Sequence, residues 1–175
     1  MEEEVLVSKW EAKVVSRRLR KASADQIWPF LQDFFGIHKW FPSLSNSYGI
    51  HGNNGEIGSI RYCTGSSIPS QRSGVEISWS KERLIGIDSD EKSLSYEIID
   101  SNIGFNSYVS TIKIIYDGNQ EGCFIEWSFT VDPVAGLKFE DLVKKYELGL
   151  ERMVEKMEGS LEILKSSSST SIVQI

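Results

Sequence analysis

The sequence predicts an α+β fold in which a curved, seven-stranded antiparallel sheet wraps around one long C-terminal helix, with two short helices after the first strand. Three observations favour this fold. Apolar residues alternate with period two across residues 46–131, and they recur at three- and four-residue steps across 138–164. The chain of 175 residues also has the size of a single domain. One sheet and one helix that each carry an apolar face are expected to bury those faces against each other.

The chain is predicted to begin with a strand and two short helices. Residues 10–20 mix β-branched and charged side chains, which is typical of a strand. Ser23 followed by Gln26 has the form of a capping box and predicts that a helix over 24–34 begins here. A second short helix is expected at 37–41.

Six further strands are expected in the period-two region, separated by turn-forming residues. They are predicted at 46–51, 57–64, 74–84, 93–100, 107–116 and 122–131. In the last strand the odd-numbered residues from Cys123 to Val131 share one face, and the even-numbered residues share the other. This alternation predicts an antiparallel meander with one packed face and one partly wet face.

The long helix is predicted over 138–164, which at 1.5 Å per residue gives roughly 40 Å, enough to cross the sheet. Its apolar stripe consists of Phe139, Leu142, Val143, Tyr146, Leu150, Met153, Val154, Met157, Leu161 and Leu164. We therefore expect one domain over residues 1–165 and a disordered, serine-rich tail over 166–175. A sheet curved around a helix can enclose a cavity, although the same elements could also pack solid.

Composition narrows the classes of function. The 19 basic and 25 acidic residues give a net charge of −6, which argues against nucleic acid as a partner. No apolar run reaches the ~20 residues of a membrane span, and the acidic start lacks the basic region of a signal peptide. Two cysteines and two histidines without metal-binding spacing predict no metal site. We expect a cytoplasmic monomer with free thiols.

Arg61 raises the main functional question, because it lies inside the predicted strand 57–64 and a glycine-, serine- and proline-containing stretch follows it. It could be a solvated surface residue, half of a buried ion pair, or the polar contact at the bottom of a ligand pocket. A pair formed with Glu82 could also do no more than fix the register of two strands. Lys81 and Arg83 flank Glu82, so the carboxylate could instead pair locally.

Several short stretches, in order and at matching separations, resemble a known superfamily. They are IHKWFPSLS at 37–45, GSIRY at 58–62, SWSKERLIGID at 78–88, LSY at 94–96 and IEWSF at 125–129. Together with the element order they resemble the plant helix-grip (START-like, Bet v 1-type) proteins of the polyketide cyclase/dehydrase superfamily. Within this superfamily, the matching stretches resemble the lachrymatory-factor synthases in particular. The resemblance runs from about Trp10 to Leu164.

The resemblance implies particular site residues. The arginine and glutamate tied to activity in the lachrymatory-factor synthases match Arg61 and Glu82, and a strand tyrosine matches Tyr108. All three are then expected to point into the cavity. A carboxylate can take a proton from carbon while a guanidinium holds the oxygen on which charge develops. Another pocket tyrosine of those synthases is replaced here by Ile98, so the same substrate is not expected.

The pocket wall and its entrance are expected from the same resemblance. Residues that could be either core or pocket wall are Trp79, Tyr96, Ile98, Trp127, Phe139, Leu142 and Tyr146. The mobile gate of the abscisic-acid receptors, which share this fold, would correspond to Ser66, Ser67, Ile68 and Pro69, although a simple turn is the alternative. The receptors' carboxylate-binding lysine would fall near Ser43, so hormone reception by that mechanism is not expected.

Two functions follow as hypotheses. The first is a cofactor-independent enzyme of the lachrymatory-factor synthase or polyketide cyclase type, which shifts a proton on a small hydrophobic substrate as an isomerase or lyase. The second is a non-catalytic protein that binds or transports a hydrophobic plant metabolite or lipid. Both need an apolar cavity, and only the first needs Glu82 as a base.

Overall fold

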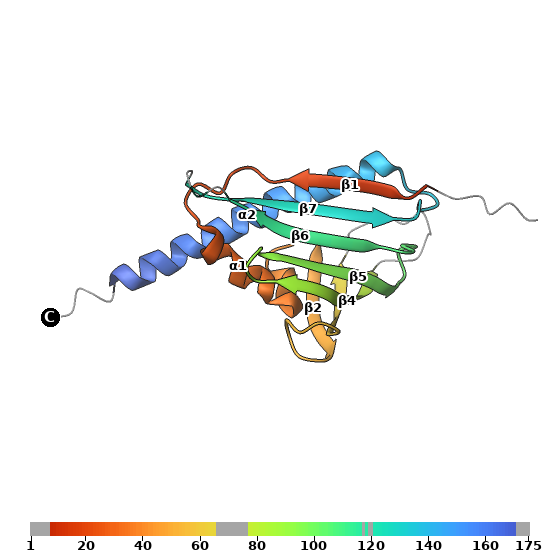
Figure 1. Cartoon of the computed structure of the whole chain (residues 1–175), viewed down its shortest axis with the longest axis horizontal. Coiled ribbons are helices and arrows are strands. Elements are labelled where there is room, and N and C mark those ends of the chain that lie inside the picture. Colours follow the sequence, from red (N-terminus) through yellow and green to blue (C-terminus); the bar gives the residue numbers. More distant parts are fainter. Residues whose placement is uncertain (1–7, 66–76, 117, 119–120, 171–175) are drawn as a thin grey trace, which may run out of the picture.

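One antiparallel sheet and one long helix make up most of the molecule (Figure 1). The computed structural model describes residues 8–65, 77–116, 118 and 121–170. In these residues seven strands form a sheet in the order β1-β7-β6-β5-β4-β3-β2, and every neighbouring pair is antiparallel. Helix α2, Phe139–Thr170, runs diagonally behind the sheet in Figure 1. The predicted α+β helix-grip fold is confirmed.

The strands follow the predicted alternation closely. They are β1 Trp10–Val15, β2 Leu44–His51, β3 Ile60–Gly65, β4 Ser78–Asp88, β5 Ser93–Ser101, β6 Val109–Ile115 and β7 Phe124–Val131. In β7 the odd-numbered residues from Ile125 to Val131 are buried and the even-numbered ones are half-buried, as the period of two requires. The buried face meets Leu142, Leu150 and Met153 of α2, which are each at most 1% exposed. Burial of such side chains stabilises the fold by about 1.5–3 kcal/mol each.

The first strand ends earlier than predicted because Ser16 interrupts its ladder. The backbone N–H of Ile125 donates to the Ser16 hydroxyl oxygen at 3.0 Å, and that hydroxyl donates to the Arg17 carbonyl at 2.7 Å. The chain then returns to β7 only as an isolated bridge between Leu19 and Cys123. The predicted strand over 10–20 is therefore a regular strand to Val15 followed by irregular backbone.

Two short helices follow β1 at one end of the sheet. Helix α1, Ala24–Gln32, begins with the predicted capping box, in which Ser23 and Gln26 exchange hydrogen bonds of 3.2 and 3.0 Å. The second helix is a 3₁₀ helix, η1, Phe34–Lys39, and it begins three residues earlier than predicted. The shift brings Phe34 into the core, where its side chain is fully buried.

Helix α2 is longer than the sequence indicated. It continues through residues 166–170, which were expected to belong to a disordered tail. The Ser166 hydroxyl donates to the Glu162 carbonyl at 3.0 Å, so a serine of the tail bonds back to the preceding turn. Figure 1 shows this end of α2 extending past the sheet. Residues 171–175 lie outside the described part of the chain.

None of the described helices combines the length and the apolar character needed to cross a membrane.

Candidate functional site

A cavity of about 70 Å³ lies between the inner face of the sheet, the segment around η1 and the first turns of α2. Most of its wall is hydrocarbon, contributed by side chains that are far apart in the sequence. The apolar wall includes Ile37, Phe41, Leu44, Ile98, Phe105 and Leu142. Other residues that line the cavity include Arg61, Ser80, Glu82, Lys145, Tyr96 and Tyr146. An apolar enclosure with a few polar groups is the usual form of a small-molecule site.

Arg61 and Glu82 meet inside this cavity as a buried ion pair. They are direct partners in the register of β3 and β4, and both face the interior. Nε of Arg61 donates to Oε1 of Glu82 at 2.8 Å, and Nη2 lies 2.7 Å from the same oxygen. Arg61 is 2% exposed and Glu82 is 8% exposed. Of the alternatives for Arg61, the geometry excludes the solvated surface residue.

The guanidinium of Arg61 is held on several sides. Its Nη1 donates to the Phe34 carbonyl at 2.8 Å, which links η1 to the sheet. Its Cζ lies 3.9 Å from the Phe34 ring centroid and 4.6 Å from that of Tyr96, so two aromatic faces flank the cation. Burial lowers the pKa of Arg61. The charge of Glu82 and the smaller contributions of Cys63, Tyr96 and the hydrogen bond to Glu82 together outweigh burial, so the net pKa is raised. Arg61 is therefore a fixed cation in the cavity wall.

The carboxylate of Glu82 has partners on both oxygens. The Ser80 hydroxyl donates to Oε2 at 3.0 Å, and Sγ of Cys63 lies 3.7 Å from Oε1. Burial, followed by the charge of Glu82, raises the pKa of the Cys63 thiol. Cys63 thus stays protonated and serves as a weak hydrogen-bond donor to the carboxylate.

Tyr108 lies behind the cavity wall, although it was expected to point into the cavity. Its ring stacks between Phe105 and Phe129, with centroid distances of 5.4 and 5.9 Å. Its hydroxyl forms a hydrogen bond with that of Tyr146, and Tyr146 does line the cavity. Burial raises the pKa of both tyrosines well above the usual value, so both remain neutral phenols.

The predicted pocket residues divide into two groups. Tyr96, Ile98, Trp127, Leu142 and Tyr146 line the cavity. Trp79 does not, because it faces the outer surface of the sheet and stacks on Tyr62 at 5.9 Å with an interplanar angle of 16°. Phe139 packs against Trp10 at the start of α2, with ring centroids 5.6 Å apart. The proposed gate residues Ser66, Ser67, Ile68 and Pro69 lie outside the described residues.

Lys145 was not predicted as a site residue, although it is a lysine in the wall of a largely apolar cavity. It is half-buried on α2, beside Tyr146 and three residues after Leu142, and it contributes to the cavity wall. Burial lowers the pKa of its ammonium group to about 7. The sequence could have indicated that Lys145 faces inward, because residues three apart share a helix face and Leu142 was predicted to face inward.

The lowered pKa of Lys145 makes stability depend on pH. In the unfolded chain a lysine titrates near 10.4, so between about pH 7 and 10 the unfolded state binds more protons than the folded state. The free energy of unfolding should therefore rise with pH across this range, by roughly 1 kcal/mol per pH unit. Lys145→Met should remove this rise in urea unfolding curves measured at pH 6, 7.5 and 9.

The matched control is Lys144→Met, since Lys144 is the exposed neighbour on the same helix. Subtracting the profile of Lys145→Met from that of the wild type cancels the other titratable groups of the cavity wall, which are Arg61, Glu82, Tyr96 and Tyr146. Parallel profiles for the wild type and Lys145→Met would contradict the prediction.

Phe41 is seated against Gly149 of α2. A Cβ at position 149 would lie 2.2 Å from Cε2 of the Phe41 ring, too close for any real contact. Phe41 has little room to move, because its ring meets the edge of Trp127 with centroids 5.2 Å apart. The bare backbone at Gly149 therefore lets the cavity wall approach the helix.

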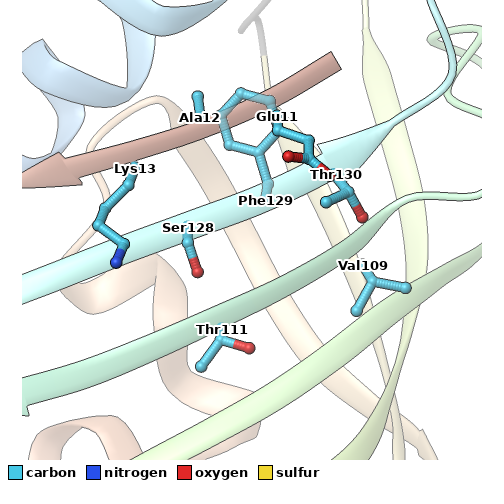
Figure 2. A pocket seen from close by; sticks show the side chains of 8 residues that line it. All are labelled: Glu11, Ala12, Lys13, Val109, Thr111, Ser128, Phe129 and Thr130. Atoms are coloured by element: carbon cyan, nitrogen blue, oxygen red, sulfur yellow. The ribbon is translucent and has the colours of Figure 1, made fainter. Parts of the chain in front are cut away.

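A second hollow, of about 460 Å³, is open to solvent on the outer face of the sheet. Figure 2 shows Lys13 of β1, Ser128 of β7 and Thr111 of β6 projecting into it from neighbouring strands. Side chains that project in parallel from neighbouring strands leave such a depression on a sheet surface. They do not form an enclosed site in which several polar groups point at one ligand. We therefore assign the functional site to the inner cavity, where the charged pair lies.

The described residues contain no group of three or more His, Cys, Asp or Glu side chains placed to hold a metal ion. The charged groups of the cavity, one carboxylate with two basic side chains, are suited to an organic ligand with a polar end.

Comparison with known proteins gives one family and several similar folds. The family model described as "Polyketide cyclase / dehydrase and lipid transport" matches residues 11–166. An uncharacterised protein from Bacillus thuringiensis is similar at 21% identity and a TM-score of 0.62, covering 86% of this chain and 98% of that one. Major latex-like protein 151 from Panax ginseng has 16% identity and a TM-score of 0.60, covering 87% and 96%. The protein XoxI from Bacillus cereus has 17% identity and a TM-score of 0.61, covering 90% and 98%. At these identities the solved structures establish the fold alone.

Proposed function

This chain belongs to the polyketide cyclase/dehydrase and lipid transport family, and on that basis we propose that it is a cofactor-independent enzyme acting on a small hydrophobic molecule. The reaction is a proton shift of the isomerase or lyase kind, as the resemblance to lachrymatory-factor synthases implies. The substrate occupies the cavity between the sheet and α2.

The observation that supports this proposal is the ion pair of Arg61 and Glu82 in the wall of an apolar cavity. Glu82 is the base that takes a proton from a substrate carbon and returns it at another position. Arg61 has five N–H donors, and donors remain after its contacts to Glu82 and Phe34. These donors stabilise negative charge that develops on a substrate oxygen, without any change in the position of the cation.

Tyr146 is the third polar contact in this scheme. Tyr146 lines the cavity, and in this scheme its neutral hydroxyl donates a hydrogen bond to the substrate. Tyr108, which is buried behind it, bonds to that hydroxyl and so positions Tyr146. We therefore propose that Tyr108 acts through Tyr146 and does not touch the substrate.

A second candidate function is binding or transport without chemistry. One observation favours it: both oxygens of Glu82 already have a donor in this structure, Arg61 and Cys63 on one and Ser80 on the other. A carboxylate held in this way can serve as a structural counter-ion that keeps Arg61 in the wall. Arg61 then anchors the polar end of an unchanged ligand.

The two functions differ in what happens to the ligand. The wild-type protein is incubated with a hydrophobic metabolite mixture in D₂O, and bound and released species are compared by chromatography and mass spectrometry. An enzyme that moves protons returns a species with altered retention time or added deuterium. A binding protein returns every ligand unchanged, and that result would contradict the catalytic proposal.

Filling the cavity should abolish ligand binding under either function. Ile98→Trp adds an indole to a cavity of about 70 Å³, so we expect the affinity for an apolar fluorescent probe to fall at least about tenfold. The control is Ile99→Trp, since the adjacent Ile99 is exposed outside the cavity. Titration of the probe by fluorescence measures both variants. Equal affinity for Ile98→Trp and the wild type would show that the probe does not enter this cavity.

A further inference from the structure

Lys145 is the charged residue that α2 contributes to the described lining of the cavity. Leu142 and Tyr146 are buried on the same helix, Gly149 has no side chain, and Leu150 is again buried. Lys145 lies within this stretch and contributes to the cavity wall. The exposed Lys144 on the outer face of the helix keeps its hydration. An amine in an apolar cavity loses hydration in its charged form, which costs free energy, so the position of Lys145 suggests a function.

Two of the charged side chains that line the cavity lie on the sheet side. Arg61 and Glu82 form a closed pair at 2.7–2.8 Å on the sheet side. Lys145 enters from the helix side, so a ligand between sheet and helix meets the ion pair and the amine from different elements. This arrangement gives the cavity two separate polar contacts.

We propose that Lys145 is a covalent attachment point for carbonyl compounds, and that the cavity takes small hydrophobic aldehydes or ketones. This inference rests on the proposed role of the cavity as the ligand site and names the chemical class of its ligand.

The bond-forming step is the condensation of a primary amine with a carbonyl group. The lone pair of Nζ adds to the carbonyl carbon and forms a C–N bond. The carbonyl oxygen then leaves as water, taking both hydrogens of the amine, and a C=N bond remains. The step needs a neutral amine, and burial, which lowers the pKa of Lys145 to about 7, supplies one at neutral pH. The apolar wall limits the water that would reverse the reaction.

A carbonyl ligand fits the cavity better than a carboxylate. A carboxylate would bring a second negative charge into a site whose guanidinium is already paired with Glu82, and it would have to lose its own hydration. An aldehyde or ketone enters neutral. Once its carbon is bonded to protonated nitrogen, the adjacent C–H becomes more acidic, which suits a reaction in which Glu82 removes that proton.

Reductive trapping tests the proposal. The protein is incubated with hexanal and sodium cyanoborohydride, which donates hydride to the C=N carbon and leaves a stable secondary amine. We expect one main adduct, mapped to Lys145 by peptide mass spectrometry. Lys145→Met and Lys145→Arg should lower the yield of that adduct at least about tenfold, while Lys144→Met should leave it unchanged.

A parallel probe displacement measurement separates the two possible failures. If hexanal displaces an apolar fluorescent probe but labels Lys144 as strongly as Lys145, the carbonyl role is overturned while the cavity remains a ligand site. If hexanoate rather than hexanal competes in a manner that depends on Lys145, the lysine is an anion anchor and the carbonyl role is likewise overturned. If neither the probe nor hexanal binds, the proposed function itself fails, and the inference fails with it.

Discussion

Replacing Arg61 by methionine should lower the free energy of unfolding by about 3–5 kcal/mol, the cost typical of breaking a buried ion pair. Glu82 would remain as a buried carboxylate whose only described donors are Ser80 and the weak thiol of Cys63. The Phe34 carbonyl would also lose its donor. Urea unfolding followed by tryptophan fluorescence measures the loss.

The sheet offers a matched control on its other face. Arg83 pairs with Glu97, but these side chains are 44% and 31% exposed, against 2% and 11% for Arg61 and Glu82. Arg83→Met should therefore cost at most about 1 kcal/mol. The double variant Arg61→Met with Glu82→Leu should recover much of the loss, because no buried charge remains. An equal cost for Arg61→Met and Arg83→Met would show that the buried pair contributes no more than a surface pair.

Replacing Glu82 by glutamine should lower the rate of product formation about 10²–10⁴-fold, the usual contribution of a general base. Glutamine keeps the shape of the side chain and an oxygen that can accept from Arg61, but it cannot take a proton from carbon. The affinity for an apolar probe should stay close to that of the wild type. Product formation is followed by the deuterium and retention-time assay described above.

Glu97→Gln provides the control for this variant, since it removes a carboxylate of the outer face that pairs with Arg83. Its rate should equal that of the wild type. Unchanged turnover in Glu82→Gln would reject the role of base and leave Glu82 as the counter-ion of Arg61. A wild type that itself leaves its ligands unaltered is a separate outcome, and it would favour the binding function.

The period of two in the strands predicts which residues of β4 face the site. Once Glu82 is placed inside, the alternation of β4 puts Ser80 inside with it, and both line the cavity. Trp79 is three residues from Glu82, so the same alternation places it outside. The prediction that Trp79 forms part of the pocket wall therefore conflicted with the prediction for Glu82, and the sequence alone could have shown this.

Other features depend on how distant segments meet, and no local pattern contains them. The apolar stripe of α2 predicted Phe139 and Leu142 alike as inward residues. Only the path of the helix shows that Phe139 meets Trp10, whereas Leu142 reaches the cavity. Tyr108 is likewise buried, but it contacts the cavity-lining Tyr146 and does not itself line the cavity. The size of the cavity depends on the gap between helix and sheet, which side-chain packing decides.

The close packing of Phe41 on Gly149 limits which residues can replace this glycine during evolution. Glycine inside a helix costs roughly 0.5–1 kcal/mol relative to alanine, so a mutation to alanine would locally strengthen α2. The added methyl group would at the same time displace the Phe41 ring from its seat. A change to alanine at position 149 would therefore stabilise the helix and at the same time disturb the packing of Phe41 in the cavity wall. Divergence at position 149 is therefore a short route to a cavity of different size in descendants of this protein.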